Sequence, residues 1–191
     1  MAIHETSDIV IEKGGSSMSS FKLGDKMPNF SLPTIQGDHI DFDKHLEEHQ
    51  SWHLIVFFRG SWCPVCVEEL KELEQQQSYF QDKDIHLMAI STDNPDDLKA
   101  FADKEGLSFP IMYDHDLTSL KAYEVHYHGE DAPYEDHGVH GEPAYFLLNE
   151  KGQVLYQQRQ TSPFGRPHAN ELRKIIQYIR KNLRGQYKSL K

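Results

Sequence analysis

Two cysteines, Cys63 and Cys66, are the residues whose type and spacing most directly indicate chemistry in this chain. They form a Cys-x-x-Cys pair, with Trp62 before the first thiol and Pro64 after it. Thiols one helical turn apart can close a disulfide, and the dipole at a helix N-terminus lowers the pKa of a nearby thiol. Cys63, nearer the expected helix start, gains most from that effect. The pair predicts thiol redox chemistry.

Two other interpretations of the pair compete with redox chemistry. The cysteines could be inert core residues, or they could form half of a zinc site. A zinc site would need two histidines as well, because the chain has no third cysteine. A Cys-x-x-Cys pair between a strand and a helix favours the redox interpretation, and two thiols are too few to staple a secreted scaffold.

The elements around the pair are expected to form a strand followed by a helix. Residues 53–58, HLIVFF, are an apolar run too short for a helix and typical of a strand buried on both faces of a parallel sheet. Pro64 suits the first helical turn, and apolar residues recur at helical spacing from Val67 to about Phe80. The pair therefore lies at the carboxyl end of a strand, where α/β sheets place their sites.

The rest of the chain predicts a mixed α/β domain. A small N-terminal hairpin is expected over 30–42, with its turn at Gly37-Asp38, and a second hairpin around the turn Asn149–Gly152, where glycine supplies a positive φ. Further strands are expected over 85–90, 109–113, 145–148 and 154–160, and helices over 95–106, 117–123 and 172–183. This order predicts a mixed central sheet with helices on both faces.

Length, composition and charge bound the function. A chain of 191 residues with 38% hydrophobic residues suits one domain, and a net charge of −10 argues against a general nucleic-acid or membrane-surface binder. Residues 159–191 hold nine basic residues and one acidic residue, which we interpret as the solvated face of a C-terminal helix rather than a partner-binding patch. Residues 1–20 are expected to be a flexible tail before a domain at 21–191. They lack the pattern of a secretory signal, which with the absence of a long apolar run predicts a cytoplasmic protein.

A histidine-rich segment, residues 126–140, has two interpretations. It holds four histidines, His126, His128, His137 and His140, with four carboxylates between them. Imidazole and carboxylate could together bind a transition metal. We favour a mobile acidic loop beside the active site, because the spacing matches no tetrahedral zinc motif. No metal site is therefore predicted.

Two stretches resemble the thioredoxin superfamily. Residues 58–66, FRGSWCPVC, are similar to its active-site motif, and residues 138–148, GVHGEPAYFLL, resemble its second signature. The resemblance implies a thioredoxin-like fold in which Pro143 is a cis proline facing the disulfide. The longer chain, the N-terminal hairpin and the spacing of the elements over about residues 21–183 resemble the alkyl hydroperoxide reductase/thiol-specific antioxidant group, that is, peroxiredoxin-like proteins.

The resemblance also places individual residues within that group. Peroxiredoxins carry Pro-x-x-x-Thr-x-x-Cys, in which the cysteine attacks peroxide; Cys66 matches that cysteine, while Arg59 replaces the proline and Cys63 the threonine. The family's later arginine falls on Pro143, so the hydroxyl and guanidinium that polarise a peroxide are both expected to be missing. Glu69 resembles a glutamate found in both branches. It is expected either to accept the Cys66 proton through water or merely to suit the first helical turn.

Together these features predict a thiol–disulfide oxidoreductase of the peroxiredoxin-like group. Cys63 attacks a substrate disulfide and Cys66 resolves the mixed disulfide. Trp62 and Pro64 contact the substrate polypeptide; Arg59 either holds the thiolate or, as we slightly prefer, points to solvent. The expected partners are a disulfide-containing protein or a peroxide and a cellular thiol reductant, with no organic cofactor. The alternatives are a thiol peroxidase, with Cys66 peroxidatic and Cys63 resolving, and a redox-sensing binding module.

Overall fold

The computed structural model describes residues 21–129 and 137–188, which are built around one five-stranded sheet. Its strand order is β5-β4-β3-β8-β9. The strands are β3 (Trp52–Phe57), β4 (Ile85–Ser91), β5 (Ile111–Tyr113), β8 (Ala144–Leu148) and β9 (Val154–Arg159). The first three run parallel, whereas β8 is antiparallel to both β3 and β9. The prediction of a mixed central sheet is confirmed.

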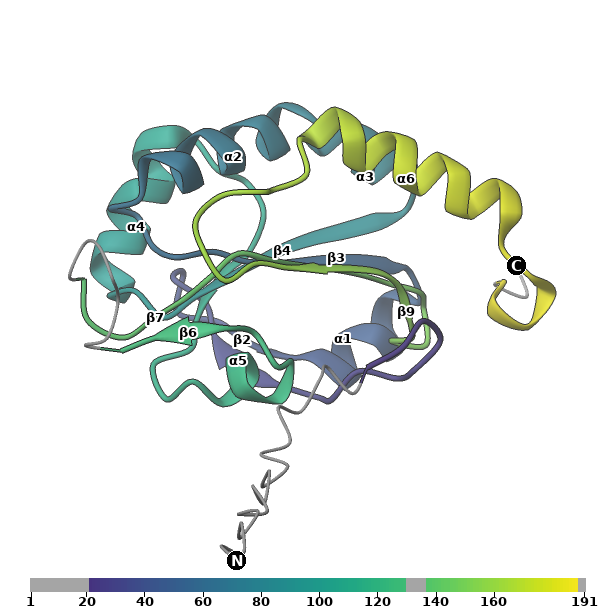
Figure 1. Ribbon diagram of the computed structural model, residues 1–191, viewed down its shortest axis with the longest axis horizontal. Helices are drawn as coiled ribbons and strands as arrows, with labels where there is room; N and C mark the ends of the chain where they lie inside the picture. Colours follow the sequence, from purple (N-terminus) through teal and green to yellow (C-terminus); the bar gives the residue numbers. More distant parts are fainter. Residues whose placement is uncertain (1–20, 130–136, 189–191) are drawn as a thin grey trace, which may run out of the picture.

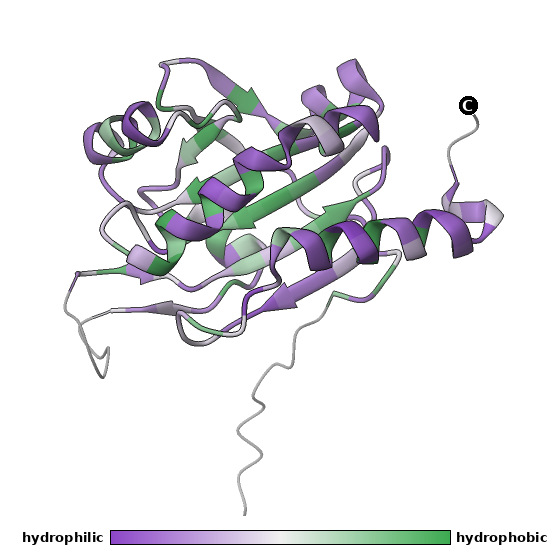
Figure 2. Ribbon diagram, turned by 90° about the horizontal axis from the view of Figure 1, so that it is seen from above, coloured by the Kyte–Doolittle hydropathy of each residue, from purple (hydrophilic) through white to green (hydrophobic). Residues whose placement is uncertain are grey.

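Helices cover both faces of the sheet, as Figure 1 shows. One face packs under α2 (Pro64–Gln75), α3 (Gln77–Asp82), α4 (Pro95–Glu105) and α6 (Ala169–Asn182), and the other against α1 (Phe42–His49) and α5 (Thr118–Ala122). Side chains of β3 alternate between the two cores: Leu54 and Val56 join the first, and Ile55 and Phe57 the second. In Figure 2 the ribbon of the central strands is mostly hydrophobic, in green, and that of the helices mostly hydrophilic, in purple.

Both predicted hairpins are present. Strands β1 (Ser31–Pro33) and β2 (His39–Asp41) pair antiparallel, with Leu32 opposite Ile40. The β8–β9 turn contains Gly152 at φ +73°, in the left-handed region that its glycine was expected to supply. A short 3-10 helix, η1 (Gly185–Tyr187), follows α6.

The structure differs from the sequence prediction in three places. The single helix expected from Pro64 to Phe80 is two helices, broken at Gln76. Helix α1 was not predicted, because only Phe42 and Leu46 of its eight residues are buried and its apolar pattern is therefore sparse. The ends of the histidine-rich segment form a small ladder, β6 (Tyr127–His128) with β7 (His140–Gly141).

The basic C-terminal region is only partly a solvated helix face. On α6, Lys174, Arg180 and Lys181 are exposed, as predicted, but Arg166 precedes the helix and its side chain is 6% exposed. No helix in the described part of the chain has the length and apolar character needed to span a bilayer. The tail predicted over 1–20 lies outside the described residues, so the domain division stays a prediction.

Candidate active site

The cysteine pair lies where β3 leads into α2. Cys63 is the N-cap of α2 and Pro64 its first residue; the Cys63 carbonyl accepts a hydrogen bond from Val67 N at 3.0 Å. The connecting turn is anchored to β4 and the loop after it. Phe58 N donates to the Ile90 carbonyl at 3.0 Å, and Ser61 donates to Asp93 Oδ2 from both its backbone N (2.8 Å) and its hydroxyl (2.6 Å). These bonds fix the thiols at the predicted carboxyl edge of the parallel strands.

Gly60 lets the indole of Trp62 pack against this turn. A Cβ at position 60 would lie 2.3 Å from Trp62 Nε1 and 2.9 Å from Asp93 Oδ2, closer than real Cβ contacts. Trp62 is half-buried: its ring stacks on His137 at a centroid distance of 3.7 Å, and the Arg59 guanidinium carbon lies 4.7 Å from the ring centroid. The predicted contact of Trp62 with a substrate polypeptide stays a prediction.

The two thiols are both buried and both reduced, but their electrostatics are opposite. Hydrogen bonds from the Cys66 thiol and, more weakly, from the Cys66 backbone N–H and Arg59 lower the pKa of Cys63 to about 5 against the opposing effect of burial. At neutral pH Cys63 is therefore a thiolate. Burial and the neighbouring Cys63 sulfur raise the pKa of Cys66 well above its usual range, so Cys66 keeps its proton.

Arg59 faces the thiols rather than solvent, so our slight preference for a solvent-facing side chain is wrong. The residue is 3% exposed, and its Nη1 lies 3.7 Å from Cys63 Sγ. Its other contacts explain why it is buried: Nε forms an ion pair with Glu142 Oε2 at 3.5 Å, and Nη2 lies 3.3 Å from His140 Nε2. The predicted catalytic residue Arg59 is thus placed to stabilise the Cys63 thiolate.

Burial and a hydrogen bond to Gly138 set the protonation state of His140, which lies against Arg59. The Nδ1 atom of His140 lies 2.8 Å from the Gly138 carbonyl, which only accepts hydrogen bonds, so Nδ1 carries the proton. Burial lowers the pKa of His140, so the ring is neutral and Nε2 accepts from Arg59. His128 Nε2 lies 3.3 Å from Glu142 Oε1 on the other side of the carboxylate.

A second arginine, Arg166, lies against both sulfurs. Its Nη2 is 3.1 Å from Cys66 Sγ and 3.9 Å from Cys63 Sγ, and its Nη1 forms an ion pair with Glu69 Oε2. The family resemblance predicts that the guanidinium that polarises a peroxide is missing, because the family's arginine falls on Pro143. That expectation is wrong: Arg166, from the irregular segment between β9 and α6, supplies the charge. A hydroxyl at position 63 is still absent from the sequence.

Glu69 lies beside the thiols, one turn beyond Cys66 on α2. Burial raises its pKa to about 7, and the charge of Arg166 offsets part of that rise. Its Oε1 is buried and makes no hydrogen bond. A carboxyl group that titrates near neutral pH can take up and release a proton, which is what a proton acceptor requires. The choice between a proton acceptor and a helix-turn preference stays a prediction.

Pro143 lies at the same sheet edge as the thiols, but its peptide bond is not cis. Ala144 pairs with Phe57, the last residue of β3, which places Pro143 just beyond that pair. Every peptide bond in the described residues is trans, so the cis prediction is wrong. The chain passes directly from β7 into β8, with Glu142 N bonded to the His126 carbonyl at 2.7 Å, and no tight turn here requires a cis bond.

The metal hypothesis for residues 126–140 stays untested, because residues 130–136, which carry all four carboxylates, lie outside the described residues. Within 21–129 and 137–188, one group of three metal-ligating side chains has its ligand atoms within 4.8 Å of one another. This group is His45, His53 and His86, and it lies outside the histidine-rich segment. Instead, His128 and His140 contact the Glu142 carboxylate beside Arg59.

Sequence reasoning missed Arg166 and Glu142. Arg166 is 100 residues from Cys66 and belongs to no motif around it, so its only signal was its place in the basic C-terminal region. Glu142 stands directly before Pro143, within the stretch that resembles the second signature, and it is 1% exposed. A lone acidic residue inside an apolar stretch was the available signal.

The fold is similar to that of solved peroxiredoxins. The crystal structure of peroxidoxin BcpB from Mycobacterium tuberculosis matches with a TM-score of 0.70 and 19% identity, over 86% of this chain and 99% of that chain. The match defines the class of fold, a thioredoxin-like domain of the peroxiredoxin type.

Sequence comparison gives the family. Residues 23–157 match the AhpC/TSA family, and the chain belongs to that family. A thiol-disulfide oxidoreductase ResA of Halalkalibacterium halodurans is 26% identical over 135 residues, which cover 70% of this chain and 66% of ResA. A putative peroxiredoxin of Mycobacterium tuberculosis is 27% identical over 154 residues, which cover 80% of this chain and 93% of the relative. With its paired thiols, the chain is a thiol-dependent oxidoreductase.

Proposed function

We propose that this protein is a thiol–disulfide oxidoreductase in which Cys63 attacks and Cys66 resolves. The opposite pKa shifts of the two thiols carry the proposal: the pKa of Cys63 is lowered to about 5, whereas that of Cys66 is raised. The attacking thiol of a disulfide exchange must be a thiolate, and the resolving thiol must keep its proton until the mixed disulfide has formed. The similarity to ResA, a thiol-disulfide oxidoreductase, supports this assignment.

The reaction consists of two exchanges. The Cys63 thiolate attacks one sulfur of a substrate disulfide, forms a Cys63–substrate disulfide and expels the other substrate sulfur as a thiolate. Loss of the Cys63 charge removes one of the effects that raise the pKa of Cys66. Cys66 then gives up its proton and attacks the Cys63 sulfur, which closes the Cys63–Cys66 disulfide and expels the second substrate thiolate. A cellular thiol reductant restores the dithiol; no organic cofactor takes part.

Glu69 and Arg166 serve the second exchange. Glu69, with a pKa of about 7, is the carboxyl group available for the Cys66 proton. Arg166 Nη2, 3.1 Å from Cys66 Sγ, stabilises the thiolate that results. Because the same guanidinium pairs with Glu69, it holds the proton acceptor and the sulfur in one cluster.

Exposed apolar side chains beside the site support a polypeptide substrate. Val65 is 40% exposed, Val139 50% and Phe164 65%, and these residues lie one or two positions from Pro64, His140 and Arg166 respectively. A cavity of about 380 Å³ lined by Val65, Glu69, Phe164 and other residues adjoins them. Cys63 itself is only 1% exposed, so a polypeptide disulfide reaches it only after a movement that uncovers the thiol.

Thiol peroxidation is the second candidate, favoured by the contact of Arg166 with Cys66. A guanidinium at 3.1 Å from Cys66 Sγ can polarise a bound peroxide, and a small oxidant needs less access than a polypeptide. In this reaction the Cys66 thiolate attacks one oxygen of hydrogen peroxide, the O–O bond breaks, and Cys66 becomes a sulfenic acid while the expelled hydroxide takes up a proton and leaves as water. Cys63 then attacks that sulfur, and water leaves as the disulfide forms. The raised pKa of Cys66 counts against it as the attacking thiolate.

Substitution of single cysteines distinguishes the two reactions. In the proposed function, Cys63→Ser abolishes reduction of insulin disulfides, and Cys66→Ser accumulates a mixed disulfide with the substrate. If Cys63→Ser instead retains single-turnover consumption of hydrogen peroxide at the rate of the wild type, peroxidation is the reaction and our assignment is wrong.

We further propose that the protein works in the cytoplasm, where thiols are kept reduced; equal mixtures of oxidised and reduced Cys63–Cys66 in intact cells would contradict this.

A further inference from the structure

The pairing of β3 with β4 brings two histidines together. In this parallel pair His53 is the direct register partner of His86. Neighbours of His53 and His86 on the same strand faces, such as Ile55 and Met88, belong to the core under α1. Both imidazoles therefore point to the face that α1 covers, at the amino ends of the two strands. Cys63 and Cys66 lie beyond the opposite, carboxyl end of β3.

Helix α1 adds two more histidines above this pair. His45 and His49 are four residues apart, which places them on one face of the helix, a spacing that helices use to bind a metal with two imidazoles. The His45 ring centroid lies 5.1 Å from that of His53 and 5.2 Å from that of His86, and the His49 centroid lies 4.5 Å from that of His86.

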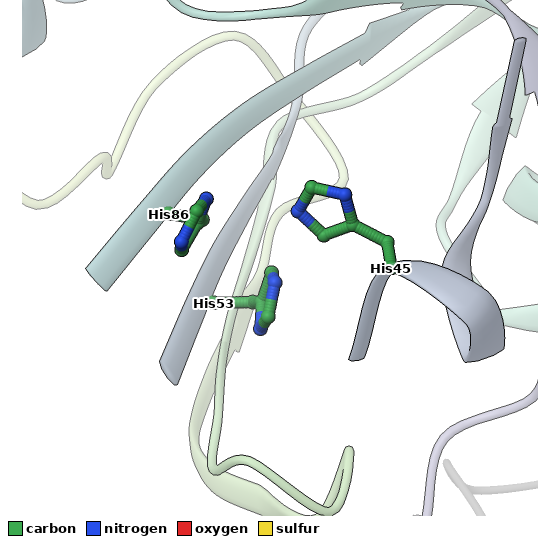
Figure 3. Close-up of side chains that lie close together, drawn as sticks. All are labelled: His45, His53 and His86. Carbon is green, nitrogen blue, oxygen red and sulfur yellow. The ribbon is translucent and has the colours of Figure 1, made fainter. Parts of the chain in front are cut away.

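The imidazoles of His45, His53 and His86 converge on a common space. Figure 3 shows the three rings, one from the helix and one from each of two adjacent strands, facing each other. One nitrogen from each ring lies within 4.8 Å of one nitrogen from each of the others.

The central histidine of this group is buried without a hydrogen bond. His53 is 0% exposed; neither of its ring nitrogens has a partner at full hydrogen-bonding distance and angle, and its one weaker polar contact is with the backbone of Ser51. His45 Nε2 is also buried and makes no hydrogen bond. Buried polar atoms without a partner destabilise a fold, and natural proteins keep few of them. Unpartnered nitrogens on both His53 and His45 indicate that an ion able to accept their lone pairs belongs beside these rings.

We propose that His45, His53 and His86 form a binding site for a divalent transition metal such as Zn²⁺, separate from the cysteine pair. Imidazole nitrogens are preferred ligands of zinc, copper and nickel, and three histidines with one open position are a known zinc arrangement. The exposed His49 or a water molecule completes four-coordination.

The observed geometry requires only a small closure to coordinate a metal. At a Zn–N distance of about 2.0–2.1 Å, tetrahedral ligand nitrogens lie roughly 3.3 Å apart, compared with a limit of 4.8 Å here. His45 and His86 are half-buried and can rotate toward His53. A surface cavity of about 260 Å³, lined by residues that include His45 and His86, gives an ion access from solvent.

The charge state of the rings also suits a metal. Burial, with added repulsion from neighbouring histidines, lowers the pKa of His45 to about 4 and that of His53 to about 3. These rings are neutral at pH 7, which is the form that binds metal. The competing interpretation is that these imidazoles simply pack together, and this interpretation gives no metal affinity.

Zinc titration of the full-length chain tests the site. The titration is done in a Cys63→Ser/Cys66→Ser background, so that the thiols cannot bind the ion, and uses isothermal calorimetry with Zn²⁺ as the only ligand. The matched variants are His53→Leu and His86→Gln, and the control is His115→Gln, an exposed histidine outside the cluster. Leucine at position 53 replaces a buried polar group that has no partner, so this variant is expected to fold.

The proposal predicts one Zn²⁺ per chain in the background and in His115→Gln. Each cluster variant should lose affinity by more than the roughly 10–100-fold that loss of an outer-shell partner costs. Absence of binding in the background, or binding that both cluster variants retain, would overturn it. X-ray absorption of the zinc-loaded background gives a test that needs no cluster variant: three or more imidazole ligands support the site, and a shell made mainly of oxygen contradicts it.

Discussion

Substitution of Cys66 by alanine and, in a matched variant, by serine tests what keeps Cys63 ionised. The largest contribution to the low pKa of Cys63 is the hydrogen bond from the Cys66 side chain. A hydrogen bond to a charged group contributes about 1.5–3 kcal/mol, and 1.36 kcal/mol corresponds to one pKa unit. Alanine, which cannot donate, should therefore raise the pKa of Cys63 from about 5 to roughly 6–7. Serine retains a donor and should preserve most of the lowering.

The assay is the pH dependence of thiolate ultraviolet absorbance in the two variants, each of which has Cys63 as its only thiol. Absorbance is preferable to an alkylation rate, because a thiolate of higher pKa is intrinsically more nucleophilic and the two effects partly cancel. We expect the alanine midpoint to lie about 1–2 units above the serine midpoint. Identical midpoints near 5 would refute the assignment of the Cys66 hydrogen bond, and identical midpoints near the unperturbed value of 9.0 would show that Cys63 is not stabilised as a thiolate at all.

Between the folded pKa of Cys63, about 5, and the unperturbed value of 9.0, the unfolded chain binds more protons, so the stability of the reduced protein should rise with pH. Urea unfolding at several pH values should show a slope up to about 1.4 kcal/mol per pH unit steeper than in Cys63→Ser; equal slopes would contradict this. Glu69→Gln should slow release of substrate from the mixed disulfide by about 100-fold or more while leaving the first attack within a few-fold; rapid-quench kinetics separates the two steps, and equal slowing of both would argue against a proton acceptor. Arg166→Met should destabilise the fold by about 3–5 kcal/mol, because it leaves Glu69 buried without its partner; the double variant with Glu69→Leu should recover most of this loss, and no recovery would contradict the pairing. Gly60→Ala should displace the Trp62 indole and shift its fluorescence toward the solvent-exposed wavelength; an unchanged spectrum would show that the turn has room for a Cβ.

The sheet and most helices were predictable because their signals are local. The run from His53 to Phe58 is apolar on both faces, and β3 is buried along its whole length. Helix α1 was not predicted because it lacks such a local signal. A short amphipathic helix that buries only Phe42 and Leu46 has too few apolar positions to show a helical period.

The site could be predicted only where its residues are neighbours in sequence. Spacing placed Cys63 and Cys66 at the start of α2, and the family resemblance added Glu69 on the same helix. Arg166 arrives through the packing of the segment before α6 against α2, a contact between residues about 100 positions apart that no local spacing reports. The burial of Arg59 likewise depends on Glu142 and His140, which β7 and the start of β8 bring to the same edge.

The histidine cluster was not predictable, because it depends on strand register. Within its own strand His53 is one polar residue in an apolar run, and His86 is another. Only the pairing of β3 with β4 sets the two rings side by side, and only the packing of α1 brings His45 over them. A one-residue shift in either strand would turn its histidine to the opposite face.

The most direct test of the central claim is stopped-flow fluorescence of the reduced protein, mixed in parallel with a small disulfide and with hydrogen peroxide. Trp62, against Arg59 and close to the thiols, reports oxidation, and the Trp62→Phe variant separates its signal from that of Trp52. We predict rapid exchange with the disulfide, lost in Cys63→Ser, and reaction with peroxide at a rate near that of a free thiol. Peroxide oxidation far faster than disulfide exchange, and retained in Cys63→Ser, would contradict the account and make Cys66 the attacking thiol.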